Sequence, residues 1–266
     1  MRDRMNSYTR DLVIVTGAGR GIGRSIAFGL GRMGAMVLCI SKSKRAEETS
    51  NLISKNGGKS DWIATDLAEY EQTGERVSAW LNNKTFSRIG LVLAAATLGP
   101  SGPLQSTFLT EWDITFRTNV LGNLAVVQAT LPILLENKNG RLVFFAGGGA
   151  AYAYPIFPAY AATKTALVRV VENLHEDLKG AGDFAVAILA PGAVETDTLA
   201  CVREHGGYVR TTVPIEEPVG FVLEFLSAGK CGFSGCFVHV RDEWQSLLNS
   251  DGQLCVKDLW KLRRVE

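Results

Sequence analysis

A glycine-rich segment near the start of the chain constrains the fold more than any other feature. Thr16–Gly23 has the sequence TGAGRGIG and follows the apolar run Leu12–Val15. Apolar residues at helical spacing come next, at Ile22, Ile26, Leu30 and Met33. Glycine permits the positive φ angles of a tight turn, and it lets backbone N–H groups approach a pyrophosphate at a helix N-terminus. The pattern therefore predicts a strand, a dinucleotide-binding turn and a helix.

Apolar runs alternate with helical patterns along the rest of the chain. Uninterrupted apolar runs are typical of parallel strands that are buried on both faces. We therefore expect one α/β domain over residues 1–266, a single doubly wound, Rossmann-like parallel sheet with helices on both faces; a second small domain is the alternative. Strands are predicted at Leu12–Val15, Met36–Ile40, Trp62–Ala64, Leu91–Ala95, Leu142–Ala146, Ala185–Leu189 and Cys236–Val240, and later helices near Ala46–Lys55, Tyr70–Asn82, Leu109–Asn137, Pro158–Lys179 and Glu217–Ser227.

Composition and charge argue against several classes of function. The chain has 28 Lys and Arg against 27 Asp and Glu, a balance that predicts no nucleic-acid partner. Residues 1–10 lack the apolar core of a secretory signal, and the uncharged stretch Thr118–Leu135 contains polar residues and a proline, so we expect no membrane span. The five cysteines form no C-x-x-C pair, which predicts a cytoplasmic protein without a metal site.

Further motifs follow the glycine turn in a fixed order. Asp66-Leu67 comes after the third predicted strand, Asn119 stands three residues before Gly122 in the long helix, and Tyr160 stands four residues before Lys164. The segment Pro191–Thr196 reads PGAVET. Together these motifs resemble the short-chain dehydrogenase/reductase family from about Asp11 to Val240.

The resemblance implies an oxidoreductase that moves a hydride between a nicotinamide and a carbonyl or alcohol carbon. It implies that Tyr160 is the acid/base, that Lys164 modifies the pKa of Tyr160 and holds the nicotinamide ribose, and that Asn119 organises a water linking Lys164 to solvent. It also implies a homodimer or homotetramer, assembled through the helix Leu109–Asn137 and the helix that carries Tyr160.

The chemistry of the Tyr160–Lys164 pair agrees with that role. Residues four apart lie on one face of a helix. A phenol has an ordinary pKa near 10, so it is a poor base at neutral pH. An ammonium about 4 Å away would favour the phenolate by roughly 4 kcal/mol, or at most about 3 pKa units, and desolvation would oppose that effect. We expect a phenol that exchanges protons near neutral pH.

The residues after the second predicted strand bear on the choice of cofactor. Ser41-Lys42-Ser43 follows Ile40, and no acidic residue occurs before Glu47. A carboxylate there would bind a ribose 2′-OH and repel a 2′-phosphate, whereas Lys42 and Arg20 can pair with phosphate, so NADP(H) is favoured over NAD(H). The alternative is that Lys42 and Lys44 are solvated surface charges. The expected cofactor contacts are Gly17, Arg20, Gly21, Ile22, Gly23, Ser41, Lys42, Asp66, Leu67, Ala95, Tyr160, Lys164, Pro191, Gly192, Val194 and Thr196.

The chain departs from the family pattern at the position of the substrate-orienting serine. That residue normally lies thirteen residues before the tyrosine, where this chain has Gly147. The loss of one preorganised donor typically costs 10²–10³ in rate. Tyr152 or Tyr154 could replace the hydroxyl, or the glycines could leave room for a substrate that orients itself. Gly147 could also adopt a backbone conformation that serine disfavours.

Two other departures affect the local structure. Ala94-Ala95-Ala96 stands where the family has Asn-Ala-Gly, so a structural hydrogen bond is lost and we expect a local adjustment. Arg241-Asp242-Glu243-Trp244 replaces the usual glycine turn, and the extension 241–266 is apolar enough to pack on its own subunit or on a partner.

Two functional hypotheses remain from the sequence. The first is an NADP(H)-dependent oxidoreductase acting on a carbonyl or secondary alcohol of a small substrate. A lid at Thr198–Glu216 would hold Arg203, Glu204, His205, Tyr208 and Arg210, which favours a polar substrate. The second is a dinucleotide-binding pseudo-enzyme that works as a scaffold or sensor, because the serine is missing.

Overall fold

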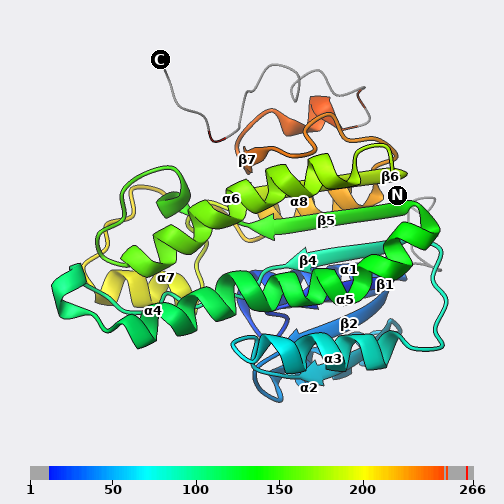
Figure 1. The fold of residues 1–266 in the computed structure, drawn as a ribbon, viewed down its shortest axis with the longest axis horizontal. Helices are drawn as coiled ribbons and strands as arrows, with labels where there is room; N and C mark the ends of the chain where they lie inside the picture. Colours follow the sequence, from blue (N-terminus) through cyan, green and yellow to red (C-terminus); the bar gives the residue numbers. More distant parts are fainter. Residues whose placement is uncertain (1–11, 249, 251–261, 263–266) are drawn as a thin grey trace.

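A single seven-stranded parallel sheet forms the centre of the molecule, and the α/β fold class is confirmed (Figure 1). The computed structural model describes residues 12–248, 250 and 262. The strand order is β3-β2-β1-β4-β5-β6-β7. The chain adds β2 and β3 on one side of β1, then returns to add β4 to β7 on the other side, so the order changes direction between the neighbours β1 and β4. The strands are β1 (Leu12–Thr16), β2 (Met36–Ser41), β3 (Lys59–Ala64), β4 (Ile89–Leu93), β5 (Asn139–Phe145), β6 (Asp183–Ala190) and β7 (Phe237–His239).

Helices cover both faces of the sheet, as the uninterrupted apolar strands predict. α1 (Gly21–Arg32), α2 (Arg45–Lys55) and α8 (Glu216–Ser227) pack on one face, and α3 (Tyr70–Leu81), α5 (Gly122–Asn137) and α6 (Pro158–Leu178) pack on the other (Figure 1). Two shorter helices, α4 (Leu109–Phe116) and α7 (Asp197–Glu204), both lie at the end of the molecule toward which the strands point (Figure 1).

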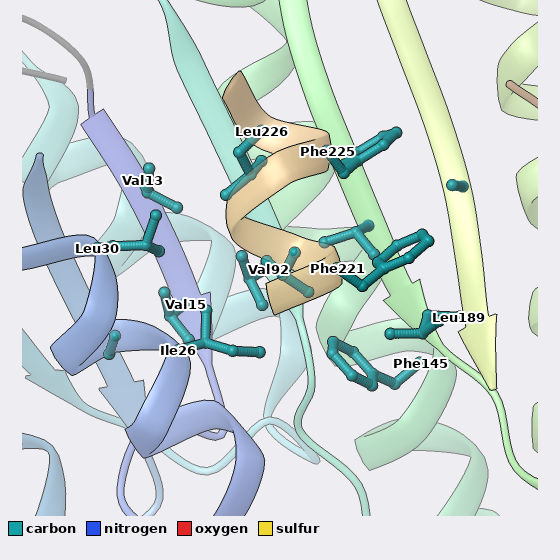
Figure 2. Close-up of a cluster of buried hydrophobic side chains, with 14 of the residues drawn as sticks. Val13, Val15, Ile26, Leu30, Val92, Phe145, Leu189, Phe221, Phe225 and Leu226 are labelled. Carbon is teal, nitrogen blue, oxygen red and sulfur yellow. The ribbon is translucent and has the colours of Figure 1, made fainter. Parts of the chain in front are cut away.

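The core on the α1/α8 face joins the two halves of the sheet. Figure 2 shows Phe221 and Phe225 of α8 over β5 and toward β6, whereas Ile26 and Leu30 of α1 lie beside Val15 and Val13 of β1 in the same cluster. The four helical side chains are fully buried. Burying an aliphatic or aromatic side chain of this size stabilises a fold by roughly 1.5–3 kcal/mol. This cluster therefore fixes the strand ends that carry the loops of the site.

The predicted long helix Leu109–Asn137 is divided in the structure. A π-helical turn, Arg117–Leu121, separates α4 from α5. The wider turn brings the side chain of Asn119 into the interior, where it is fully buried. This stretch is also the one among the described residues whose length and mean hydropathy, 1.4, would allow a membrane crossing. In the fold α5 packs along α3, and α4 packs against α6.

The first residues of the extension 241–266 pack on their own subunit. Trp244 is buried, its ring centroid lies 4.7 Å from that of Phe221 in an edge-to-face contact, and its indole N–H donates to the carbonyl of Val240 at 3.1 Å. Leu247 and Leu248 pack against the same core. Leu254, Leu259 and Trp260, on which part of the expectation rested, lie outside the described residues.

Candidate active site

The carboxyl ends of β1 and β4 meet at the glycine turn, where the strand order changes direction. Gly17 has φ +69°, and a Cβ there would lie 2.9 Å from the backbone nitrogen of Ala95. A Cβ at Gly23 would overlap the carbonyl of Gly17. The glycines therefore let the backbone of the turn pack closely against its neighbours on one side. The other side of the turn faces the cavity. This bare cradle at the start of α1 fits a dinucleotide pyrophosphate.

A polar network under the turn compensates for the missing asparagine at Ala94–Ala96. Asn123 of α5 accepts a hydrogen bond from the Thr16 hydroxyl at 2.7 Å and donates to the carbonyl of Ala95 at 3.1 Å. The N–H of Ala95 donates to Thr16 Oγ1 at 3.1 Å. The anchor thus comes from a neighbouring helix. Sequence reasoning missed Asn123, although a polar residue one helical turn after Asn119 in an apolar helix is a feature that could have identified it.

One cavity of about 1130 Å³ runs from the glycine turn to Tyr160 and Lys164. Its volume exceeds the 300–1,000 Å³ range of most ligand pockets, so it can hold a dinucleotide and a small substrate side by side. Every residue expected to contact the cofactor lines this cavity, from Gly17 through Thr196, and Asn119 lies behind the lining. The loop of Pro191, Gly192 and Val194 forms the wall after β6.

Basic and hydroxyl side chains gather at one end of the cavity. Ser41, Lys42, Ser43 and Arg45 line it there, and Arg45 is a residue that the sequence reasoning missed. Lys42 is mostly exposed, and its ammonium pairs with Asp66 at 2.7 Å. Partial burial raises the pKa of Asp66, but the hydrogen bonds from Lys42 and the N–H of Ala68 outweigh it and leave that pKa below its ordinary value. Lys42 is therefore held at the cavity by a carboxylate.

Tyr160 and Lys164 project from α6 at the other end. Lys164 is buried, its ammonium donates to the carbonyl of Phe145 at 2.7 Å, and it lies 5.4 Å from the Tyr160 ring centroid. Burial lowers the pKa of Lys164 to about 7. Burial, with a smaller contribution from Tyr154, raises the pKa of Tyr160 above its ordinary value.

The expected lowering of the Tyr160 pKa by Lys164 is therefore wrong for this structure. Desolvation penalises the charged forms of both groups, and it lowers the pKa of Lys164 to about 7. The lysine charge is thus too weak to outweigh the burial of the phenol. Tyr160 is a protonated hydrogen-bond donor at neutral pH.

Asn119 is committed to neighbouring backbone and side-chain groups. Its Nδ2 donates to the carbonyl of Thr97 and to the hydroxyl of Thr163, both at 2.9 Å, and its Oδ1 accepts from the N–H of Thr97 at 2.7 Å. These bonds hold α6 and the loop after β4 against the π-helical turn. The organisation of a water by Asn119 stays a prediction.

Gly147 lies directly against the phenol of Tyr160. Its φ of −167° and ψ of 172° are extended values that any residue adopts, so the expectation of a backbone that disfavours serine is wrong. The obstacle is instead steric, because a Cβ at Gly147 would lie 2.7 Å from Tyr160 Oη. Tyr154 is partly buried in the same cavity, whereas Tyr152 is 80% exposed at its edge.

The lid segment presents different side chains to the cavity from those expected. Of the five polar residues named in this segment, only Tyr208 lines the cavity. Arg203 is held by Glu195 through two hydrogen bonds of 2.8 and 2.7 Å, and the ring of His205 packs edge-on to Phe157. The cavity is lined in addition by apolar and aromatic residues, namely Leu98, Ile114, Tyr152, Tyr154, Leu199, Val202, Tyr208 and Val209, and by the polar residues Thr97, Thr118, Asp197 and Thr198. The argument for a polar substrate from the charged lid residues therefore fails.

Comparisons with known proteins agree with this geometry. The short chain dehydrogenase family model matches residues 11–206. An uncharacterized oxidoreductase of Staphylococcus aureus is 30% identical over 193 residues, which cover 72% of this chain and 81% of that protein.

Solved structures share the fold over most of their length. One from Beutenbergia cavernae, described as an NAD(P)-dependent gluconate 5-dehydrogenase with bound NADP, has a TM-score of 0.77 and 25% identity, covering 91% of this chain and 99% of that one. A 3-oxoacyl-(acyl-carrier-protein) reductase from Agrobacterium tumefaciens, also with NADP bound, has a TM-score of 0.76 and 24% identity, covering 90% and 95%. The chain belongs to the short-chain dehydrogenase family of oxidoreductases.

Proposed function

We propose that the protein is an NADP(H)-dependent oxidoreductase that transfers a hydride between the nicotinamide and a carbonyl or secondary alcohol of a small substrate. The observation that carries this proposal is one cavity with a bare glycine cradle in its wall, a basic cluster at one end and the Tyr160–Lys164 pair at the other. The NADP-bound relatives support the same cofactor class. The protein works in the cytoplasm as a homodimer or homotetramer.

The protonation state of the site favours carbonyl reduction. The reduced nicotinamide, when bound, supplies the hydride. Tyr160 Oη carries a proton at neutral pH and donates it to the oxygen of the substrate carbonyl, which becomes the alcohol. Lys164, fixed by Phe145, is the neighbour that returns a proton to the phenolate. The apolar and aromatic residues of the lining favour a substrate with an apolar or aromatic body.

The assignment of NADP(H) rests on Lys42 with Ser41, Ser43 and Arg45. Arg20, the second cation that the sequence led us to expect, lines the same cavity, but its guanidinium pairs with Asp197 at 2.9 Å. A 2′-phosphate would meet two cations there, and a ribose hydroxyl would find no free carboxylate because Asp66 is already paired. The expected contacts are Lys42 and Arg45 to phosphate, with the hydroxyls of Ser41 and Ser43 as additional donors.

A scaffold or sensor role is the second candidate, and Gly147 is the observation behind it. No side-chain hydroxyl from residue 147 can orient a carbonyl. We assign the missing donor to Tyr154 rather than Tyr152. Tyr154 is partly buried beside Gly149 and lies close enough to raise the pKa of Tyr160, whereas Tyr152 points largely to solvent.

Replacement of Tyr160 by phenylalanine tests the oxidoreductase activity. We expect Tyr160→Phe to lower kcat on a panel of aromatic ketones by at least about 10³-fold, because only the proton donor is removed. NADPH affinity, measured by nicotinamide fluorescence, should change by less than about threefold. Binding of NADPH by the unaltered protein, without turnover of any ketone in the panel, would support the scaffold instead.

Reversal of the charge at Lys42 tests the cofactor. Lys42→Asp should weaken NADPH binding by about 100-fold and leave NADH binding equal or tighter, because a carboxylate repels the 2′-phosphate. The exposed Lys55→Met, on the same helix as Arg45, is the control and should alter neither. Tighter NADH than NADPH binding by the unaltered protein would contradict the assignment.

Single hydroxyl changes test the replacement of the serine. Tyr154→Phe should lower kcat/KM by about 10²-fold, and Tyr152→Phe by less than about threefold. Gly147→Ser should gain little, because its Cβ displaces the Tyr160 phenol. A tenfold gain from Gly147→Ser, with no loss in Tyr154→Phe, would show that the donor is simply absent.

The buried Lys164 predicts a pH-dependent stability. Its pKa is about 7 in the folded protein and 10.5 ordinarily. Between these values the unfolded chain holds a proton that the folded protein lacks, so the free energy of unfolding rises with pH. From pH 6.5 to 9.5 the rise due to this group is about 3 kcal/mol, and Lys164→Met should lose it. Urea unfolding at both pH values measures the difference. An equal rise in Lys164→Met would contradict the lowered pKa.

A further inference from the structure

His239 reaches the cavity from β7, which forms the edge of the sheet opposite β3. It is the last residue of β7 and pairs with Ala190, the residue before the Pro191–Gly192 loop. Its side chain is half-buried and lines the same cavity as Tyr160. Neither the motifs of the sequence nor the proposed mechanism gives this histidine a role.

The backbone after β7 determines which nitrogen of the ring carries the proton. The N–H of Arg241 donates to His239 Nδ1 at 3.1 Å, so Nδ1 accepts and the neutral ring is protonated at Nε2. Asp242 stabilises the same turn with two hydrogen bonds. Its carboxylate accepts from the N–H of His239 at 2.7 Å, and its backbone N–H donates to the His239 carbonyl at 2.9 Å. The bond from Arg241 thus sets the tautomer of the ring, and the two bonds with Asp242 fix the backbone of His239.

A second contact fixes this turn against the lid segment. The guanidinium of Arg241 donates to the Thr211 hydroxyl at 3.2 Å and to the Thr212 carbonyl at 3.0 Å. The neighbouring residue Val213 pairs with Val194 of the Pro191–Thr196 loop. His239 is therefore held by the same segments that form the wall of the cavity, and its position is preorganised.

The protonated nitrogen faces the loop after β6. A Cβ at Gly192 would lie 3.9 Å from His239 Nε2. Among the residues that the structure describes, Nε2 has no hydrogen-bond partner. A neutral imidazole with one nitrogen occupied as an acceptor offers a single donor at the other, and that donor is unused beside Gly192.

The geometry points to His239 as a specificity-determining residue, whose Nε2–H donates to a second oxygen of a carbonyl substrate. This inference rests on the proposed function for the nature of the substrate. The ligand class is an apolar or aromatic ketone with another acceptor oxygen, as in a diketone, keto ester or hydroxy ketone. The apolar lining accommodates the body of the molecule, and His239 selects the additional oxygen.

Nitrogen NMR on histidine-labelled protein tests the donor directly. The chain has only three histidines, so the resonances of His239 are identified by their loss in His239→Phe. We expect the Nε2-protonated tautomer in the free protein. Addition of NADPH and 1-phenyl-1,2-propanedione to the Tyr160→Phe protein, which cannot turn over the probe, should shift the Nε2 resonance. A proton on Nδ1, or an unchanged Nε2 resonance at saturation, would overturn the inference.

Binding of two matched probes measures the selectivity. In the Tyr160→Phe protein with NADPH, nicotinamide fluorescence gives Kd for 1-phenyl-1,2-propanedione and for propiophenone, which lacks the second carbonyl. His239→Phe should reduce the preference for the dione about tenfold or more, and His239→Gln, which keeps a nitrogen donor near the Nε2 position, should retain most of it. Circular dichroism and thermal unfolding check that each variant is folded.

The outcomes separate this inference from the proposed function. Absence of turnover in the unaltered protein, together with dione binding that depends on His239, would remove the enzymatic function and retain the subsite. Turnover with an unchanged dione preference in His239→Phe would overturn the subsite and retain the function. Weaker NADPH binding in His239→Phe would assign the donor to the cofactor and overturn the inference, as would failure of both probes to bind at millimolar concentration.

Discussion

The close approach of two backbones at the centre of the sheet determines where this protein can bind anything. The turn after β1 lies against the turn after β4, with Gly17 in contact with Ala95 and no side chain between them. Thr16 and Asn123 hold the two turns together from below. Because the strand order changes direction between these strands, the crossover connections diverge to opposite faces and leave the strand ends open. The cavity extends from this junction toward the basic cluster at Lys42 in one direction and toward Tyr160 and Lys164 in the other.

Burial governs the electrostatics at the end of the cavity that holds Tyr160 and Lys164. Lys164 and Tyr160 face each other in a site where desolvation exceeds their mutual attraction, so both favour their neutral forms. The opposite balance holds at the exposed end, where Lys42 lowers the pKa of a carboxylate despite its partial burial. One end of the cavity therefore attracts anions through Lys42, and at the other end the Tyr160 phenol keeps its proton.

The sequence predicted the strands well because strands depend on local pattern. The expected cofactor contacts came instead from the family resemblance, and the structure places them along one cavity. An apolar run such as Leu142–Ala146 has few alternatives to a buried strand, and the glycines of the turn are defined by their neighbours in sequence. It predicted badly wherever two distant segments decide the outcome. The Coulomb estimate for Tyr160 could not include the desolvation of both partners, and the charged lid residues could not be oriented without knowing that Glu195 holds Arg203. Arg45 and Asn123 were missed for the same reason.

The π-helical turn before α5 makes the number of residues in this segment as important as their identity. Gly122 follows it and lies against Leu67, where a Cβ would overlap the Leu67 carbonyl, and Asn123 comes one residue later beneath the turn after β1. The π-helical turn holds one residue more than an α-helical turn over the same path, so the positions after it keep nearly the direction that an uninterrupted α-helix would give them. Loss of one residue from 117–121 would therefore leave Gly122 near Leu67 and Asn123 near Thr16. It would remove the inward turn that holds Asn119 on Thr97 and Thr163, so the length of this segment decides whether the loop after β4 and α6 are joined.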